Sequence, residues 1–125
     1  MRRHFIIGSR ADARGGIEIE TDGGLVGVVH AECPFDDWTL FKQQICDESI
    51  SKKTRRQVIA IAQWARSRIE YEDRHHVLGV RAVVVGHTPV RAPTALGNVH
   101  YIDTMAWQGG YFTIIDANTL QQATS

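Results

Sequence analysis

The chain has 125 residues, a length that suits one domain of ordinary size. Hydrophobic residues make up 43% and charged residues 22%, which is close to globular averages and excludes a wholly disordered chain. The 14 Lys and Arg residues balance the 14 Asp and Glu residues, so no net charge favours nucleic acid or an anionic membrane as a partner.

Two sequence features bear on the compartment. Cys33 and Cys46 are too few for a disulfide scaffold, and a bridge between them is disfavoured because nothing else in the chain suggests secretion. The sequence has no apolar run long enough for a signal peptide or a membrane span. We therefore expect a mixed α/β protein of the cytoplasm.

Residues 1–16 are expected to form an atypical basic arm, mobile or weakly docked, instead of a regular element. The pattern sharpens from residue 17. Residues 17–20 alternate apolar and polar side chains, which predicts a half-buried strand. Asp22, Gly23 and Gly24 suit a turn. Residues 25–30 then run apolar without alternation, as in a strand covered on both faces, and end in His30.

Two helices are predicted next. Asp36 and Asp37 suit a helix start, so residues 36–46 are expected to form a short helix, followed by a loop over 47–53. An apolar stripe at helical spacing predicts a longer helix over about 53–71 with a basic exposed face. The stripe consists of Val58, Ile61, Ala62, Ala65 and Ile69. Core positions are expected for Trp38, Phe41 and Trp64, and the basic face is interpreted as solvated.

The C-terminal part is expected to be rich in strands. Residues 81–87 run apolar and end in His87, and residues 99–103 and 111–116 read as two further strands. The polar residues 121–125 are expected to fray. The folded part of the chain is therefore expected to span residues 17–120.

Each of the two most apolar strands ends in a histidine that is followed by a turn. Side chains at adjacent strand ends commonly point into one cleft, so His30 and His87 are candidate ligands of one metal ion. The alternative is a pair of hydrogen-bonded histidines with a structural role only. Two histidines are also fewer than the three or four protein ligands of a usual metal site.

The sequence motifs around these histidines resemble those of a known protein family. Residues 28–36, VVHAECPFD, resemble the "HAD-x-P" histidine loop of calcineurin-like metallophosphatases, and the closest group is the small bacterial and bacteriophage serine/threonine protein phosphatases. Residues 85–89, VGHTP, resemble their "GHTP" segment. Residues 97–104, GNVHYIDT, resemble their "GN-x-x-YIDTGA" strand, and residues 64–69, WARSRI, resemble their "W-x-R-x-R" helix. The four words occur in the family's order.

The resemblance implies part of a β-sandwich flanked by helices and a metal-dependent phosphomonoesterase, acting on phosphoproteins or small phosphomonoesters. It implies that His30 and His87 ligate one of two metal ions, most often manganese, with iron or zinc as alternatives. It further implies that Arg66 contacts the substrate phosphate, while a water activated by the two metals attacks phosphorus. From the residues alone, a solvated helix arginine is the competing interpretation of Arg66.

Several sequence motifs of the same family are missing from this chain. We find no "D-x-H" pair, no "GDxxDRG" loop and no "GNH[DE]" loop, so the chain resembles the C-terminal half of the family only. Met105 also stands where the family has glycine. We therefore expect a truncated chain that binds metal weakly, is inactive alone, and requires a second chain to supply the missing half. Residues 25–29 and 83–85 are then expected to expose an apolar surface.

The sequence leaves two other functions open to comparison with this hypothesis. A non-catalytic half-domain would bind a partner through the uncovered face of its sheet. A nucleic-acid patch over the basic residues 52–68 is disfavoured, because the chain is neutral and this face carries no aromatic side chain.

Overall fold

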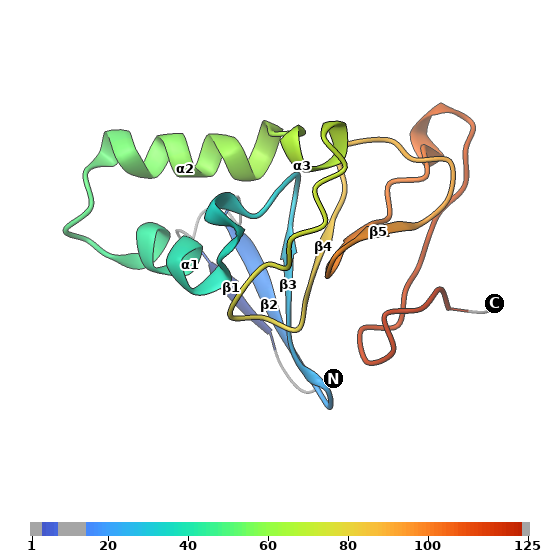
Figure 1. The fold of residues 1–125 in the computed structure, drawn as a ribbon, viewed down its shortest axis with the longest axis horizontal. Coiled ribbons are helices and arrows are strands. Elements are labelled where there is room, and N and C mark those ends of the chain that lie inside the picture. Colours follow the sequence, from blue (N-terminus) through green and yellow to red (C-terminus); the bar gives the residue numbers. More distant parts are fainter. Residues whose placement is uncertain (1–3, 8–14, 124–125) are drawn as a thin grey trace.

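Six strands form one mixed sheet in the order β1-β2-β3-β4-β6-β5 (Figure 1). We describe a computed structural model that covers residues 4–7 and 15–123. The strands are β1 (His4–Ile7), β2 (Gly16–Thr21), β3 (Gly24–Val29), β4 (Ala82–Val85), β5 (Thr94–Leu96) and β6 (Val99–Tyr101). The sheet is antiparallel over β1, β2 and β3, parallel over β3, β4 and β6, and antiparallel again at β5. The expected mixed α/β class is confirmed.

Three helices and two short 3-10 turns complete the fold. They are η1 (Pro34–Asp36), α1 (Trp38–Cys46), α2 (Lys52–Trp64), α3 (Ser67–Glu70) and η2 (Ala106–Gln108). Both longer helices begin at capped residues, because Asp37 accepts from the amide of Leu40 at 3.0 Å and Ser51 from that of Thr54 at 3.1 Å. In the described part of the chain, no helix has the length and apolar character needed to cross a membrane.

The main core lies between one face of the sheet and helices α1 and α2 (Figure 1). Trp38 and Phe41 are buried there in an edge-to-face pair, with ring centroids 5.3 Å apart. Val58 and Ala62 of α2 are buried against the same face. The core placement expected for Trp38 and Phe41 is therefore confirmed.

The predicted long helix over 53–71 is wrong in its continuity. Helix α2 ends at Trp64, Ala65 is extended at φ −68° and ψ 144°, and α3 begins after Arg66. The break also changes the buried side chains, since Trp64 is 68% exposed and Ile61 is exposed as well, although both were expected to pack. Periodicity alone gave no sign of this break, because the residues that cap α3 come from another part of the chain.

The expected strand over residues 111–116 does not form. Tyr111 and Ile115 make only single bridges, to Met105 and Gln122. Backbone hydrogen bonds in this segment are local, from the Tyr111 amide to Thr104 and from the Ala123 amide to Ile114, so none joins it to the sheet. The edge position is taken by β5, which sequence analysis missed and which turns into β6 at Gly97, where φ is +61°.

The predicted N-terminal arm contains a strand. Residues 4–7 form β1 and pair with β2, so this part of residues 1–16 belongs to the sheet. The four arginines of the arm lie outside the described residues, as do residues 124–125 of the expected tail.

The expected exposure of residues 25–29 and 83–85 is also wrong. Val26, Val29, Val83 and Val85 are at most 3% exposed. On the face away from α1, Arg81 donates to the carbonyl of Asn118 at 2.6 Å, which ties the C-terminal segment to the sheet. Ile17 and Val28 remain partly buried on that face.

Candidate functional site

His30 and His87 lie side by side at the carboxyl ends of two paired strands. Strands β3 and β4 are parallel and pair Val29 with Val85, so both chains leave the sheet at one edge. The Nε2 atom of His30 is 3.2 Å from the Nδ1 atom of His87, and the ring centroids are 4.9 Å apart. The structure therefore brings together the two histidines that sequence analysis singled out.

The turn after β4 fixes the direction of the His87 ring. The Gly86 amide donates to the carbonyl of His30 at 2.9 Å, which ties the two strand ends together. His87 has a left-handed backbone, with φ of 64°, a conformation that costs energy in a residue with a side chain. The Trp64 indole meets the His87 ring edge-on, with centroids 5.5 Å apart.

The surroundings of His87 favour its neutral form. Burial lowers the pKa of His87 from 6.5, and the nearby positive charges of His30 and Arg66 lower it further. The charge of Asp103 and a hydrogen bond with the Trp64 backbone oppose this effect. Since a metal ion binds neutral imidazole, the lowered pKa keeps His87 able to act as a ligand near neutral pH.

The two imidazoles lie within hydrogen-bond distance of each other, as in the structural alternative of the sequence analysis, and they do not form a complete metal site by themselves. Two ring nitrogens that bind one ion at about 2.1 Å each lie about 3.0–3.4 Å apart, which matches the 3.2 Å separation of the histidine nitrogens. Among residues 4–7 and 15–123, however, no group of three or more His, Cys, Asp or Glu side chains is placed to hold a metal. The described residues thus fit two ligands of a metal site, and no catalytic step follows from them alone.

Arg66 lies at the break between α2 and α3, as the residue that precedes Ser67. Its side chain is exposed, and its guanidinium has no hydrogen-bond partner in the described part of the chain. Its positive charge nevertheless acts on His87. A planar guanidinium in this position is free to bind an anion with its donor fork.

A cleft of about 590 Å³ opens beside the histidine pair. Its lining includes the half-buried side chains of Ile17 and Val28 together with His30, Gln63 and Trp64. The cleft is therefore lined by apolar side chains together with the polar groups of His30 and Gln63.

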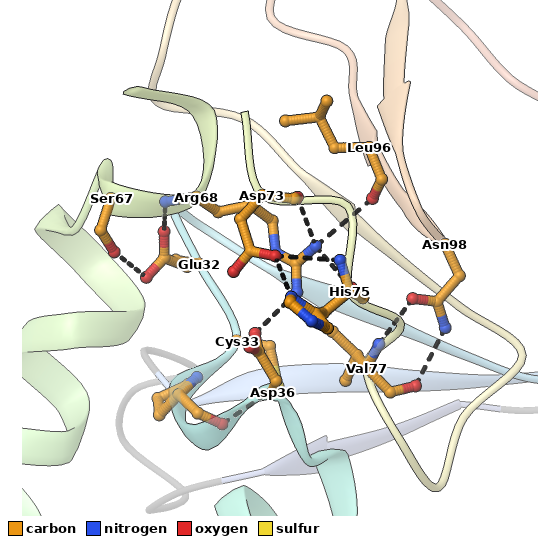
Figure 2. Close-up of polar contacts among 11 residues, drawn as sticks. Glu32, Cys33, Asp36, Ser67, Arg68, Asp73, His75, Val77, Leu96 and Asn98 are labelled. Carbon is orange, nitrogen blue, oxygen red and sulfur yellow. Dashed lines mark hydrogen bonds and ion pairs between the residues drawn. The ribbon is translucent and has the colours of Figure 1, made fainter. Parts of the chain in front are cut away.

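Sequence analysis missed the buried carboxylate of Glu32 behind the His30 loop, and its placement of Arg68 on the solvated basic face of the predicted helix is wrong. Glu32 is 9% exposed and accepts from the Arg68 amide at 2.7 Å and from the Ser67 hydroxyl at 2.8 Å (Figure 2). Arg68 is 3% exposed and donates to Asp36 Oδ1 at 2.6 Å (Figure 2). In the sequence, Glu32 and Arg68 are polar residues beside apolar neighbours. Hydrophobic periodicity does not distinguish such buried polar residues from solvated surface residues.

Cys33 follows His30 by three residues, and Met105 stands at a position where the resembled family differs from this chain. Burial raises the pKa of the Cys33 thiol to about 12, so this side chain is a packed, unreactive thiol. Both cysteines are free. Met105, where the resembled family has glycine, adopts a left-handed backbone with φ of 65° and ψ of 35°.

The chain matches no protein-family model.

Proposed function

We propose that this chain carries the histidine half of a metal-dependent phosphomonoesterase centre of the calcineurin-like type, directed at phosphoserine or phosphothreonine. The observation that supports the proposal most is the 3.2 Å separation of His30 Nε2 and His87 Nδ1 at the ends of two parallel strands. The four sequence motifs, which occur in the same order as in the family, support the same interpretation.

Each residue has a distinct role in this proposal. His30 and His87 hold one divalent cation, most often Mn²⁺, with Fe or Zn as alternatives. Such metal centres supply a water of lowered pKa as the nucleophile and stabilise charge on the phosphoryl oxygens. Arg66 binds two of the non-bridging phosphate oxygens through its guanidinium. The chain's own contribution is thus to orient a metal and a phosphate.

The centre requires further ligands from outside the described residues. Two neutral imidazoles without a carboxylate bind a divalent ion weakly, and they leave most coordination positions to water. We therefore propose that the 125-residue chain is inactive alone, and that a second chain or another copy supplies carboxylate ligands beside the histidine pair.

Mn²⁺ binding to the full chain tests this proposal. Electron paramagnetic resonance of free Mn²⁺ measures the bound fraction for the native chain and for the His30→Ala, His87→Ala and His76→Ala variants. His76 is an exposed histidine away from the pair and is the matched control. We expect weak binding that is lost in the first two variants and retained in the third.

Hydrolysis of p-nitrophenyl phosphate, with and without Mn²⁺, completes the test. No activity of the isolated chain, together with histidine-dependent Mn²⁺ binding, is the expected result. Equal Mn²⁺ binding by all four proteins would exclude the histidine pair as ligands. Metal-dependent activity that His87→Ala abolishes would show that a complete centre already assembles between copies of the chain.

A second candidate function is a half-domain that binds a partner without catalysis. The apolar lining of the cleft by Ile17, Val28 and the exposed Trp64 favours this alternative. It predicts oligomers in light scattering and binding of a hydrophobic dye, both reduced by Trp64→Ser and unchanged by His87→Ala. A dye-negative monomer would argue against it.

A further inference from the structure

The loop after His30 is attached to the helical segment on the N-terminal side of Arg66. The Ala31 amide donates to the carbonyl of Ala62 in α2 at 2.7 Å. Both Ala31 and Ala62 are at most 2% exposed, so this hydrogen bond is shielded from water. The last turns of α2 are thereby tied to the strand end that carries His30.

The same loop is attached on the C-terminal side of Arg66. One oxygen of the Glu32 carboxylate accepts from the backbone amide of Arg68, and the other accepts from the Ser67 hydroxyl (Figure 2). The amide of Arg68 is one of the unpaired donors at the start of α3, and no side chain within α3 caps it. Glu32 therefore caps a helix that is distant in sequence.

A third group fixes the loop and α3 against each other. The Arg68 guanidinium donates to Asp36 Oδ1 at 2.6 Å and to the carbonyl of His75 at 2.7 Å (Figure 2). Asp36 belongs to the loop that begins at His30, and Arg68 follows Arg66 by two residues. These hydrogen bonds consequently join the segment after His30 to the start of α3.

We propose that Glu32 is a positioning residue that holds Arg66 in place beside the His30–His87 pair. The inference deepens the proposed function and depends on its assignment of phosphate binding to Arg66. The guanidinium of Arg66 makes no hydrogen bond within the described residues, whereas its backbone carbonyl accepts from the Glu70 amide at 3.0 Å, so its location is set by its backbone. That backbone is held on one side through Ala62 and on the other through the carboxylate of Glu32.

Three variants of the full chain test the proposal. Glu32→Ala removes both hydrogen bonds. Glu32→Gln preserves them, because its carbonyl oxygen accepts from the Arg68 amide and its amide group donates to the Ser67 oxygen. Glu48→Ala removes a carboxylate at an exposed position and controls for the loss of charge.

Paramagnetic broadening by Mn²⁺ measures where Arg66 lies, because the effect falls steeply with distance from the ion. In nuclear magnetic resonance spectra of the native chain, we expect Mn²⁺ to broaden the ring signals of His30 and His87 and the Nε–H signal of Arg66. Glu32→Ala is expected to spare Arg66 while the histidine rings still broaden, and Glu32→Gln is expected to restore the native pattern. Unchanged broadening of Arg66 in Glu32→Ala overturns the proposal.

Amide hydrogen exchange without metal tests the positioning role of Glu32 if Mn²⁺ broadens neither the His30 nor the His87 ring signals. That case would defeat the proposed metal site, and the positioning role would then depend on the backbone alone. Glu32→Ala should speed exchange at Arg68 by at least about tenfold, with little change at Val84 in the sheet and native rates in Glu32→Gln. Native exchange at Arg68 in Glu32→Ala would show that Glu32 holds nothing there.

Discussion

The indole ring of Trp38 lies directly against the backbone of Gly27. A Cβ atom built on Gly27 would be 2.6 Å from Cη2 of Trp38, much closer than side-chain atoms approach. The contact explains the glycine in an otherwise apolar strand, since β3 has no side chain at the point where α1 crosses it. It also sets how closely α1 packs on the sheet.

The Gly27→Ala variant is expected to unfold more easily. The added methyl group would displace the Trp38 ring, which costs about 1–3 kcal/mol of unfolding free energy. Urea denaturation followed by tryptophan fluorescence measures this cost. Gly86→Ala is the control, because its Cβ would lie 3.7 Å from the nearest atom, and it should change stability by no more than about 0.5 kcal/mol. Equal stability of the two variants would contradict the packing described.

Replacement of Met105 by glycine should stabilise the chain relative to replacement by alanine. Both variants remove the Met side chain, but only glycine tolerates the left-handed backbone at this position without strain. We expect Met105→Gly to exceed Met105→Ala by about 1 kcal/mol in unfolding free energy. Chemical denaturation of both variants gives the difference, and a more stable alanine variant would show that residue 105 is not left-handed.

The two cysteines should differ in reactivity. Cys33 is 3% exposed and its burial raises the pKa of the thiol to about 12, whereas Cys46 is exposed. Alkylation by iodoacetamide at about pH 8 should therefore label one thiol in the folded chain and both in denaturant. Intact-mass spectrometry counts the labels, and peptide mapping identifies Cys46. Rapid labelling of both thiols in the folded chain would be inconsistent with the buried loop.

Protonation of His100 should reduce stability in mild acid. Burial and the charge of Arg81 lower the pKa of His100 below its usual 6.5. Because the pKa of His100 is lower in the folded chain, the unfolded chain binds the proton more readily at a pH between the two pKa values. The contribution of neutral His100 to the unfolding free energy is therefore present above the pKa of the unfolded chain and is lost as the pH falls toward the pKa of the folded chain. The loss of unfolding free energy from about pH 7.5 to about pH 5.5 should be smaller in His100→Gln than in the native chain.

The control for this prediction is His76→Gln, which replaces an exposed histidine. It should show the native dependence on pH. If His100→Gln and His76→Gln lose the same stability on acidification, His100 is not the buried group.

Elements with strong local signals were predictable from the sequence. The β2–β3 hairpin, α1 and β4 follow from alternation, a capping aspartate and an unbroken apolar run, each of which acts within a few residues. The proximity of His30 and His87 was also predictable, because parallel neighbouring strands end at one edge. What this required was only the correct pairing of two apolar segments.

Features that depend on distant partners were not predictable. The separate start of α3 at Ser67 is capped by Glu32, whose carboxylate comes from another segment of the chain. The irregular segment over residues 111–116 has strong strand propensity, yet its backbone bonds to its own neighbours. Local patterns carry no information about such long-range hydrogen bonds.

The pairing of β3 with β4 makes the histidine pair sensitive to strand alignment. Val29 lies opposite Val85, and the two imidazoles follow this pair directly. A shift of β4 by one residue would turn its side chains to the opposite face and carry His87 away from His30. The spacing of the two rings thus reports whether β3 and β4 pair in the correct register. An ion bound to both rings would stabilise this register relative to one shifted by a residue.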